Sequence, residues 1–392
     1  MNSAIWLASH YLWFYKRRTV TLIVCVAVTV ALPFSVRLVV ERFERQVRAR
    51  ATSTPLVAGP TGSRFDLAVH ALYFDARPTT TPNGVFRRIR SEGLADPFAV
   101  FVAGRVRDAP VVGVTVDYLH FRSLRVAQGE SIVRLGDCVV GANVARRIRV
   151  EPGERILTDP KNPFALSATP PLKMRVRGVL ARMNTPDDDA VFVDLKTAWL
   201  IAGLGHGHEP AEQVVGEGAL LDSSEEEIVL GGAVKRFLEV TDDNIDSFHF
   251  HNAVDKLPLS AIIVVPRDQK SRTVLLGRFV DDPQTQLIEP AAVVDRLMER
   301  VFRAQRFFDM LSAVLIVVTA ALVALVTSLT RRMREREFET LVKLGCSRFL
   351  QTATLWSELV IILTLAAGLA AILTAAAGAT TPQLIQSWLM AT

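Results

Sequence analysis

Three long apolar runs without a charged side chain constrain this chain more than any other feature. They cover residues 19–36, 310–330 and 359–378. A helix that crosses the hydrocarbon core of a bilayer needs about 20 consecutive apolar residues, and each run is close to that length. The first run is too long for the core of a signal peptide, so we expect a retained anchor. The sequence therefore predicts a membrane protein with three α-helical spans.

Basic clusters beside two of these runs indicate the orientation. Lys16, Arg17 and Arg18 precede the first run, and an arginine-rich stretch, 331–336, follows the second. Positive residues gather on the cytoplasmic side of a membrane, so these clusters also explain much of the net charge of +5 without nucleic-acid binding. We expect a cytoplasmic N-terminus, with the aromatic-rich residues 1–15 forming a helix on the inner membrane surface.

The long segment between the first two runs has the sequence pattern of a globular domain outside the membrane. Short β-branched runs at 100–102 and 111–116 are separated by a turn sequence, 173–177 alternates charged and apolar residues, and 260–265 reads as a buried strand. Residues 85–90 are predicted to form a helix that ends before Gly93. This mixture predicts an α+β domain inserted between spans 1 and 2.

Helical periodicity returns on both flanks of that domain. Residues 40–50 and 291–309 place apolar side chains three and four positions apart, and the second stretch leads into the second span without a break. The predicted order is an interfacial helix (1–18), a first span (19–40), an extracytoplasmic, periplasmic α+β domain with its stalk (41–290), a stalk helix (291–309), a second span (310–330), a cytoplasmic loop (331–352), a third span (353–378) and a short tail (379–392).

The loop 331–352 reads as a short amphipathic helix held at the membrane surface. Its apolar residues fall near helical spacing, and Ser347 is placed to cap the helix that follows. Residues 336–348 resemble the R-E-x-x-x-L-x-x-L-G-A-S-R stretch of MacB/FtsX/LolC-type ABC transporter permeases, with Cys346 in the usual alanine position. The residues that carry this resemblance are Arg336, Glu337, Glu339, Leu341, Leu344, Gly345, Ser347 and Arg348. Parts of 110–180 also resemble the periplasmic domain of that family.

The resemblance implies a permease subunit of a mechanotransmitting transporter in the bacterial inner membrane. In such permeases the stretch is a coupling helix that rests on a cytoplasmic ABC ATPase dimer, and two permease chains work as a homodimer or heterodimer. The expected subunit is not an enzyme and binds no cofactor directly, since the chain has no phosphate-cradling G-x-x-x-x-G-K-[ST] motif and ATP with Mg²⁺ would belong to the partner. A periplasmic protein or lipoprotein is a further expected partner, whether the system serves export, lipoprotein handling or mechanotransmission.

The chain departs from the family pattern at its C-terminal end. The family has a fourth span, whereas only a short tail follows Pro382, too little to cross a bilayer. Two readings stay open: a three-span variant, or a last helix supplied by another chain.

Two His-x-His pairs support an alternative function. His206 with His208 and His249 with His251 hold four of the seven histidines. Residues i and i+2 of a strand share a face, so such pairs could chelate zinc. The alternative is a zinc-binding, membrane-anchored sensor or assembly factor, and the plainer interpretation is two surface loops with hydrogen-bonded histidines.

Other polar features are interpreted as structural. Glu358 is expected near the membrane interface and solvated, and the acidic run Asp187, Asp188 and Asp189 is expected to be a solvated turn. The three cysteines lie too far apart in the predicted organisation to form disulfides, and no nucleophile motif indicates an enzyme active site.

Overall fold

A computed structural model describes residues 2–75, 79–160, 170–207, 220–224, 227–230, 238–250, 252–335, 340, 343 and 347–391. The chain divides into two compact units: Met1–Val47 with Arg296–Thr392, and Arg48–Asp295. We call the first the helical unit and the second the sheet domain, and we describe each by itself.

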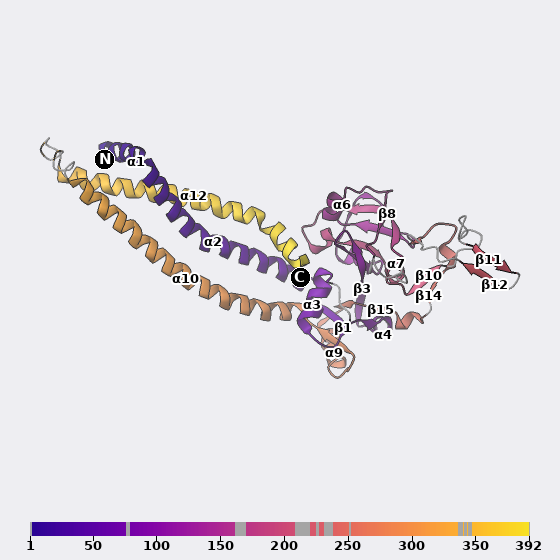
Figure 1. The fold of residues 1–392 in the computed structure, drawn as a ribbon. Helices are drawn as coiled ribbons and strands as arrows, with labels where there is room; N and C mark the ends of the chain where they lie inside the picture. The colour runs from indigo at the N-terminus through magenta and orange to yellow at the C-terminus, as the bar shows by residue number, and fades with distance from the viewer. Residues whose placement is uncertain are drawn as a thin grey trace. The chain divides into compact units, whose positions relative to one another are not determined.

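The helical unit is built from α1 (Asn2–Phe14) and parts of three long helices: α2 (Lys16–Thr52), α10 (Pro290–Met333) and α12 (Arg348–Ala391) (Figure 1). Among the described residues, three helices are long and apolar enough to cross a membrane: Lys16–Thr52, Pro290–Met333 and Thr352–Ala379. Alanines allow close approach of two of them, because Ala27 and Ala31 of α2 pack with Ala366 and Ala370 of α12. Thr29 of α2 also shares a hydrogen bond with Thr319 of α10, 3.2 Å between the hydroxyl oxygens.

The sheet domain is organised around one mixed sheet with the strand order β13-β8-β6-β9-β4-β3-β16-β1-β17, while β5 and β7 also pair with β8. The strands are β1 (Leu56–Pro60), β3 (Ala95–Val106), β4 (Ala109–Val114), β5 (Val126–Gly129), β6 (Asp137–Val140), β7 (Arg155–Leu157), β8 (Leu172–Leu180), β9 (Val191–Asp194), β13 (Leu238–Glu239), β16 (Ala261–Pro266) and β17 (Thr285–Ile288).

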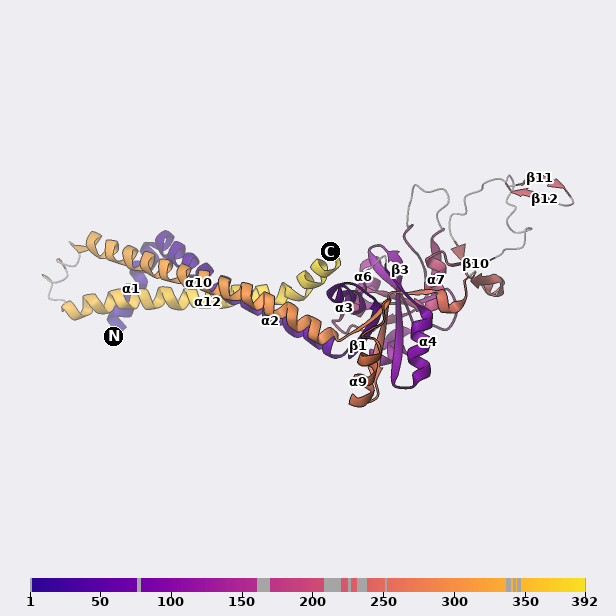
Figure 2. The same cartoon turned by 90° about the horizontal axis from the view of Figure 1, so that it is seen from below.

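Helices cover both faces of this sheet, which explains why its central strands contain runs of consecutive apolar residues. Along β9, Val191 and Val193 face one core and Phe192 faces the other. One face carries α4 (Asn83–Glu92), α6 (Ala142–Ile148), α7 (Leu195–Ile201) and α9 (Gln269–Arg278), and the other carries α3 (Arg64–Tyr73) and α5 (Tyr118–Phe121) (Figures 1 and 2). Gly113 lets α7 approach β4, since a Cβ there would lie 2.2 Å from the Ala198 Cβ.

Three two-stranded sheets and three 3₁₀ turns complete the described elements. The small sheets pair β2 (Thr81–Pro82) with β15 (Pro258–Leu259), β10 (Gly205–Gly207) with β14 (Phe248–Phe250), and β11 (Leu220–Ser224) with β12 (Glu227–Leu230). The turns are η1 (Pro186–Asp189), η2 (Ile245–Ser247) and η3 (Val254–Lys256).

The predicted fold class is confirmed: three long apolar helices flank an α+β domain. The predicted strands at 100–102, 111–116, 173–177 and 260–265 coincide with β3, β4, β8 and β16, and the predicted helix at 85–90 lies within α4. Gly93 ends that helix with φ of 66°, a left-handed conformation that favours glycine. Cys25 and Cys138 are free thiols, and burial raises the pKa of Cys138 well above its ordinary value.

Candidate functional site

The last turn of α2 enters the sheet domain through a buried ion pair. Arg50 donates from Nη1 to Asp187 Oδ2 at 2.6 Å and from Nη2 to Asp187 Oδ1 at 2.9 Å. The two side chains are only 8% and 1% exposed. A guanidinium and a carboxylate joined by two parallel hydrogen bonds have one preferred orientation, so this pair fixes both the position and the rotation of the helix end in the domain.

Asp187 is held by further donors in the turn η1. Thr185 donates to its Oδ2 at 3.0 Å, and the Tyr118 hydroxyl donates to its Oδ1 at 3.3 Å. Burial, and then the negative charge of Asp187, raises the pKa of Tyr118 above its ordinary value, so the hydroxyl keeps the proton that it donates. The Asp187 carboxylate is therefore held by Thr185 and Tyr118 as well as by Arg50.

The whole acidic run is buried, so the expected solvated turn is wrong. Asp188 accepts hydrogen bonds from the backbone N–H groups of Met183 and Asn184, and Asp189 accepts one from Asn143. Burial raises the pKa of Asp189 above its ordinary value. Gly141 lies against this turn, where a Cβ would come within 2.5 Å of the Asp187 and Asp188 carbonyl oxygens. Each carboxylate is thus a structural acceptor that closes the turn.

A second arginine ties the residues after α2 to the same place. Arg122 donates to Thr54 Oγ1 at 2.8 Å and to Ser53 Oγ at 3.2 Å, and its guanidinium lies 4.8 Å from the centre of the Phe121 ring. The exit of α2 is therefore held from two sides, by η1 and by α5. We call Arg50, Asp187, Tyr118 and Arg122 the stalk root.

The two long helices also meet at the surface of the sheet domain. Arg48 of α2 pairs with Asp295 of α10 at 3.2 Å, with both side chains about half exposed. An exposed pair of this kind contributes little to stability, so the stalk root is the stronger attachment.

The helical unit contains a second buried ion pair, at the border of the predicted coupling loop. Arg334, which follows α10, donates to Glu358 of α12 at 2.7 Å, and the side chains are 6% and 8% exposed. The Arg334 guanidinium also lies 3.9 Å from the centre of the Tyr11 ring of α1. Glu358 is therefore buried and paired, and the expectation that it is solvated is wrong. We call Arg334, Glu358 and Tyr11 the loop clamp, because it joins three helices where the loop leaves and returns.

The predicted coupling residues are only partly within the described structure. Ser347 accepts a hydrogen bond from the Leu350 N–H at 3.3 Å, as expected for the cap of α12, and Arg348 is the first residue of that helix. Arg336, Glu337, Glu339, Leu341, Leu344 and Gly345 lie outside the described residues, so their role stays a prediction.

One histidine of each His-x-His pair lies within the described residues, and these two histidines face each other. His206 and His249 lie directly opposite each other on β10 and β14, with ring centres 4.9 Å apart. The His249 Nδ1 lies 3.2 Å from the Ser247 carbonyl oxygen. His208 and His251 lie outside the described residues. Among the described residues, no group of three or more His, Cys, Asp or Glu side chains could hold a metal ion.

Sequence reasoning did not identify the stalk root or the loop clamp. The residues of each ion pair are far apart in the chain or separated by a whole loop, so no spacing rule joins them. A signal was present in hindsight for Glu358, an acidic residue beside an apolar run, because such a residue needs a partner when it is buried.

These features define a class of protein: a helical membrane protein with an α+β domain, in which the first long helix, α2, ends in a buried polar joint. The sequence model described as the MacB-like periplasmic core domain matches residues 19–227. The chain belongs to this family of ABC-transporter permease domains.

Two solved structures are matched over part of the chain. The periplasmic region of MacB from Actinobacillus actinomycetemcomitans matches with a TM-score of 0.34 and 10% identity, covering 63% of this chain and 92% of that one. The extracellular domain of the noncanonic ABC-type transporter YknZ from Gram-positive bacteria matches with a TM-score of 0.32 and 10% identity, covering 59% and 98%. The comparison with curated proteins gave no match.

Proposed function

We propose that this chain is the permease subunit of an ABC transporter in which a separate cytoplasmic ATPase drives movement of the MacB-like domain. The chain would lie in the cytoplasmic membrane with its N-terminus inside and the sheet domain on the far side. A second permease chain completes the assembly, and the ATPase docks on residues 331–352. The cargo would be handled on the far side, by a protein or lipoprotein that meets the sheet domain.

The observation that carries this proposal is the stalk root. A helix can transmit displacement only if it is continuous and if its end cannot slip or turn in the body that it moves. α2 is one helix from Lys16 to Thr52, and its final turn is held by the bidentate Arg50–Asp187 pair. The chain belongs to the MacB-like family, and in a permease of this kind such a joint would transmit movement of α2 to the sheet domain.

The loop clamp supports the other end of the same pathway. A docking helix between two spans can pass force to them only if the spans are held at its borders. Arg334 and Glu358 make that connection on either side of residues 335–347. Both side chains are buried, so loss of either partner would leave an uncompensated buried charge, which loss of one partner of a surface pair would not.

The first test is purification from native membranes in mild detergent, with identification of the associated proteins and an assay of ATP hydrolysis. We expect a stoichiometric ABC-type ATPase. The variants Leu341→Asp and Leu344→Asp should lose permease-dependent hydrolysis while insertion in the membrane is unchanged, because a charge replaces the apolar contact.

The matched control is Val280→Asp, which places the same charge at an apolar residue of the sheet domain that is 74% exposed. It should leave hydrolysis unchanged. Full activity in both loop variants would overturn the assignment of the coupling helix, and a preparation without any ATPase would overturn the permease proposal as a whole.

A second candidate function is metal binding by the histidine pair. The register that places His206 opposite His249 is the specific observation in its favour, because two cross-strand imidazoles can share one ion. Zinc titration of the purified chain, followed by calorimetry, should then show one site that is lost in His206→Ala and in His249→Ala. The control His120→Ala should bind zinc as the parent does. If both pair variants bind as tightly as the parent, no zinc site exists there.

A further inference from the structure

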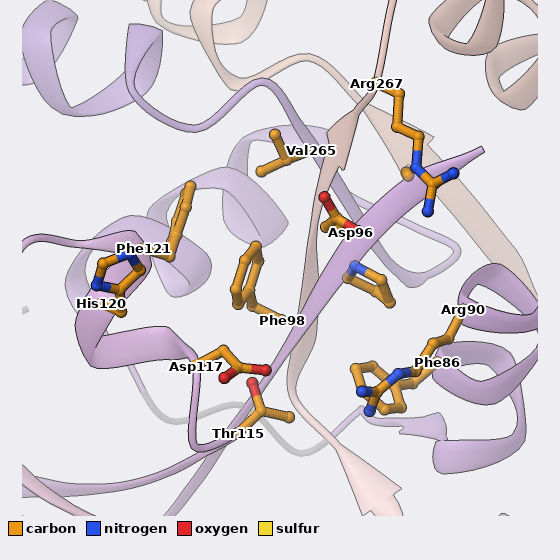
Figure 3. A pocket seen from close by; sticks show the side chains of 12 residues that line it. Phe86, Arg90, Asp96, Phe98, Thr115, Asp117, His120, Phe121, Val265 and Arg267 are labelled. Carbon is orange, nitrogen blue, oxygen red and sulfur yellow. The ribbon is translucent and has the colours of Figure 1, made fainter. Parts of the chain in front are cut away.

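The sheet domain has a pocket of about 630 Å³ at the end of β3 that neither the stalk root nor the loop clamp uses. A volume of this size suits a small ligand or a few residues of a peptide. Residues 95–99 of β3 pair with β16 on one side, whereas β4 pairs with β3 only from Val100 onward. After Val114 the chain turns away towards α5, and the pocket lies at the edge of β3 that this leaves open. Figure 3 shows the side chains that surround it.

The floor of the pocket is an aromatic surface. The Phe98 and Phe121 rings are stacked, with centres 4.4 Å apart and planes 18° from parallel. Arg122 lies 4.8 Å from the Phe121 ring centre, so the outer part of this stack is anchored to the stalk root. Both phenylalanines are partly exposed, which leaves ring surface available to a planar or apolar group.

Charges of both signs line the pocket without neutralising one another. Arg90 and Arg267 contribute guanidinium groups, and Asp96 and Asp117 contribute carboxylates. Within the described part of the chain, none of these four side chains takes part in an ion pair. In Figure 3, Arg90 and Arg267 lie on one side of Phe98, and Asp117 lies on another, beside Thr115. A ligand that carries both charges would pair with groups at the two ends of the aromatic surface.

One polar atom in the lining is buried without any partner. The Thr115 hydroxyl oxygen has no hydrogen-bond partner among the described residues, although water does not reach it. A buried hydroxyl without a partner is costly, and proteins rarely keep one unless something else completes it. A ligand that shifts the lining enough to open this oxygen, and that has a polar group there, would supply the missing hydrogen bond.

We propose that this pocket binds a short peptide segment with an apolar or aromatic side chain between one acidic and one basic residue. The aromatic side chain lies on Phe98, the acidic group pairs with Arg90 and Arg267, and the basic group pairs with Asp117. The open edge of β3 lets the peptide backbone run beside residues 95–98, although Pro97 supplies no N–H there. This inference goes beyond the proposed function, because binding at this pocket does not require an ATPase.

The test is calorimetric titration of the full chain in detergent with the capped peptide acetyl-Lys-Phe-Asp-amide. Three control peptides change one feature each: acetyl-Lys-Ala-Asp-amide lacks the ring, and acetyl-Lys-Phe-Gln-amide and acetyl-Gln-Phe-Asp-amide each lack one charge. We expect each control peptide to bind about tenfold more weakly than the parent peptide, as loss of one charged or stacked contact implies.

Variants of the pocket give the matching result from the protein side. Arg267→Ala and Asp117→Asn should each weaken the parent peptide about tenfold. Arg64→Ala removes an exposed arginine outside the pocket and should bind as the parent does. Thr115→Val keeps the shape and removes the unpartnered hydroxyl, so it should weaken the peptide without lowering the melting temperature. If the Thr115 hydroxyl had only a structural role, Thr115→Val would not weaken peptide binding while leaving the melting temperature unchanged.

Two kinds of outcome would overturn the proposal, one from the peptides and one from a small aromatic acid. If all four peptides bind equally, or if none binds, the pocket does not recognise this peptide chemistry. If phenylacetate binds as tightly as the parent peptide, the pocket takes small aromatic acids and the peptide assignment is wrong. Both outcomes are independent of whether an ATPase accompanies the chain.

Discussion

At the scale of single residues, the buried charge of Asp187 holds the end of α2 in the sheet domain. Asp187 is almost fully buried and has four donor groups from three side chains: two from Arg50, one from Tyr118 and one from Thr185. Removing one partner from such a group leaves the rest of the network with an uncompensated buried charge. The effect of a substitution at the stalk root should therefore exceed that of the same substitution at a surface pair.

We expect Arg50→Met and Asp187→Leu each to lower the free energy of unfolding of the sheet domain by about 3–5 kcal/mol. The double variant should be less destabilised than the sum of the two, because it leaves no unpaired charge. Hydrogen exchange of domain peptides, measured across a urea series on the full chain, gives the free energies.

Another arginine of α2 offers the matched control for the Arg50→Met and Asp187→Leu variants. Arg48 pairs with Asp295, and both side chains are about half exposed. Arg48→Met should therefore cost less than about 1 kcal/mol. An Arg50→Met variant that costs no more than Arg48→Met would show that the buried pair does not hold the helix end.

At the scale of elements, the loop clamp adds a buried polar contact between α1, α12 and the end of α10. α1 packs against α12, and Tyr11 presents its ring to Arg334 at 3.9 Å. A guanidinium over an aromatic ring is attracted more strongly when water is excluded from the pair. The N-terminal helix is therefore part of the same cluster as the borders of the predicted coupling loop.

Loss of that ring should loosen α1. We expect Tyr11→Leu to increase the rate of hydrogen exchange in residues 2–14 about tenfold, since a cation–π contact of about 1–2 kcal/mol is lost. Trp13→Leu is the control in the same helix, because Trp13 is 80% exposed. Equal exchange rates in the two variants would argue against a clamp at Tyr11.

At the scale of the whole molecule, the chain has two units with separate cores, because its apolar residues gather in two different kinds of packing. The helical unit packs small residues such as Ala27 and Ala366, whereas the sheet domain buries large side chains such as Phe192 and Tyr118 on two faces of a sheet. Lipid or detergent competes for the first kind of surface and water for the second, so the two units should respond to different conditions.

We expect two unfolding transitions for the full chain in detergent. Arg50→Met should lower only the transition that reports the sheet domain, and Glu358→Gln should lower only the transition that reports the helical unit. Differential scanning calorimetry with proteolysis of samples taken between the transitions assigns each one. A single transition that both variants lower equally would contradict independent units.

Much of the fold could be predicted because the relevant signals are local. The β3–β4 hairpin follows from Asp108 and Pro110 between two β-branched runs, and the structure turns there with positive φ at Arg107 and Asp108. Ser347 could be predicted as a cap because a cap acts within one helical turn. The candidate site could not be predicted in the same way. The three adjacent aspartates are strongly polar and indicate a surface turn, and nothing near them in the chain reveals that donors converge on them.

The sequence by itself determined that the chain has three helices able to cross a bilayer, an α+β domain between the first two, and a stretch resembling a coupling helix. These properties follow from runs, alternation and short motifs, in which each residue acts on its near neighbours or on lipid. Only the tertiary structure decided which charges are buried, that Arg50 meets Asp187, that Arg334 meets Glu358, and that His206 faces His249. Those contacts depend on strand register and helix packing, which bring together residues that no pattern along the chain connects.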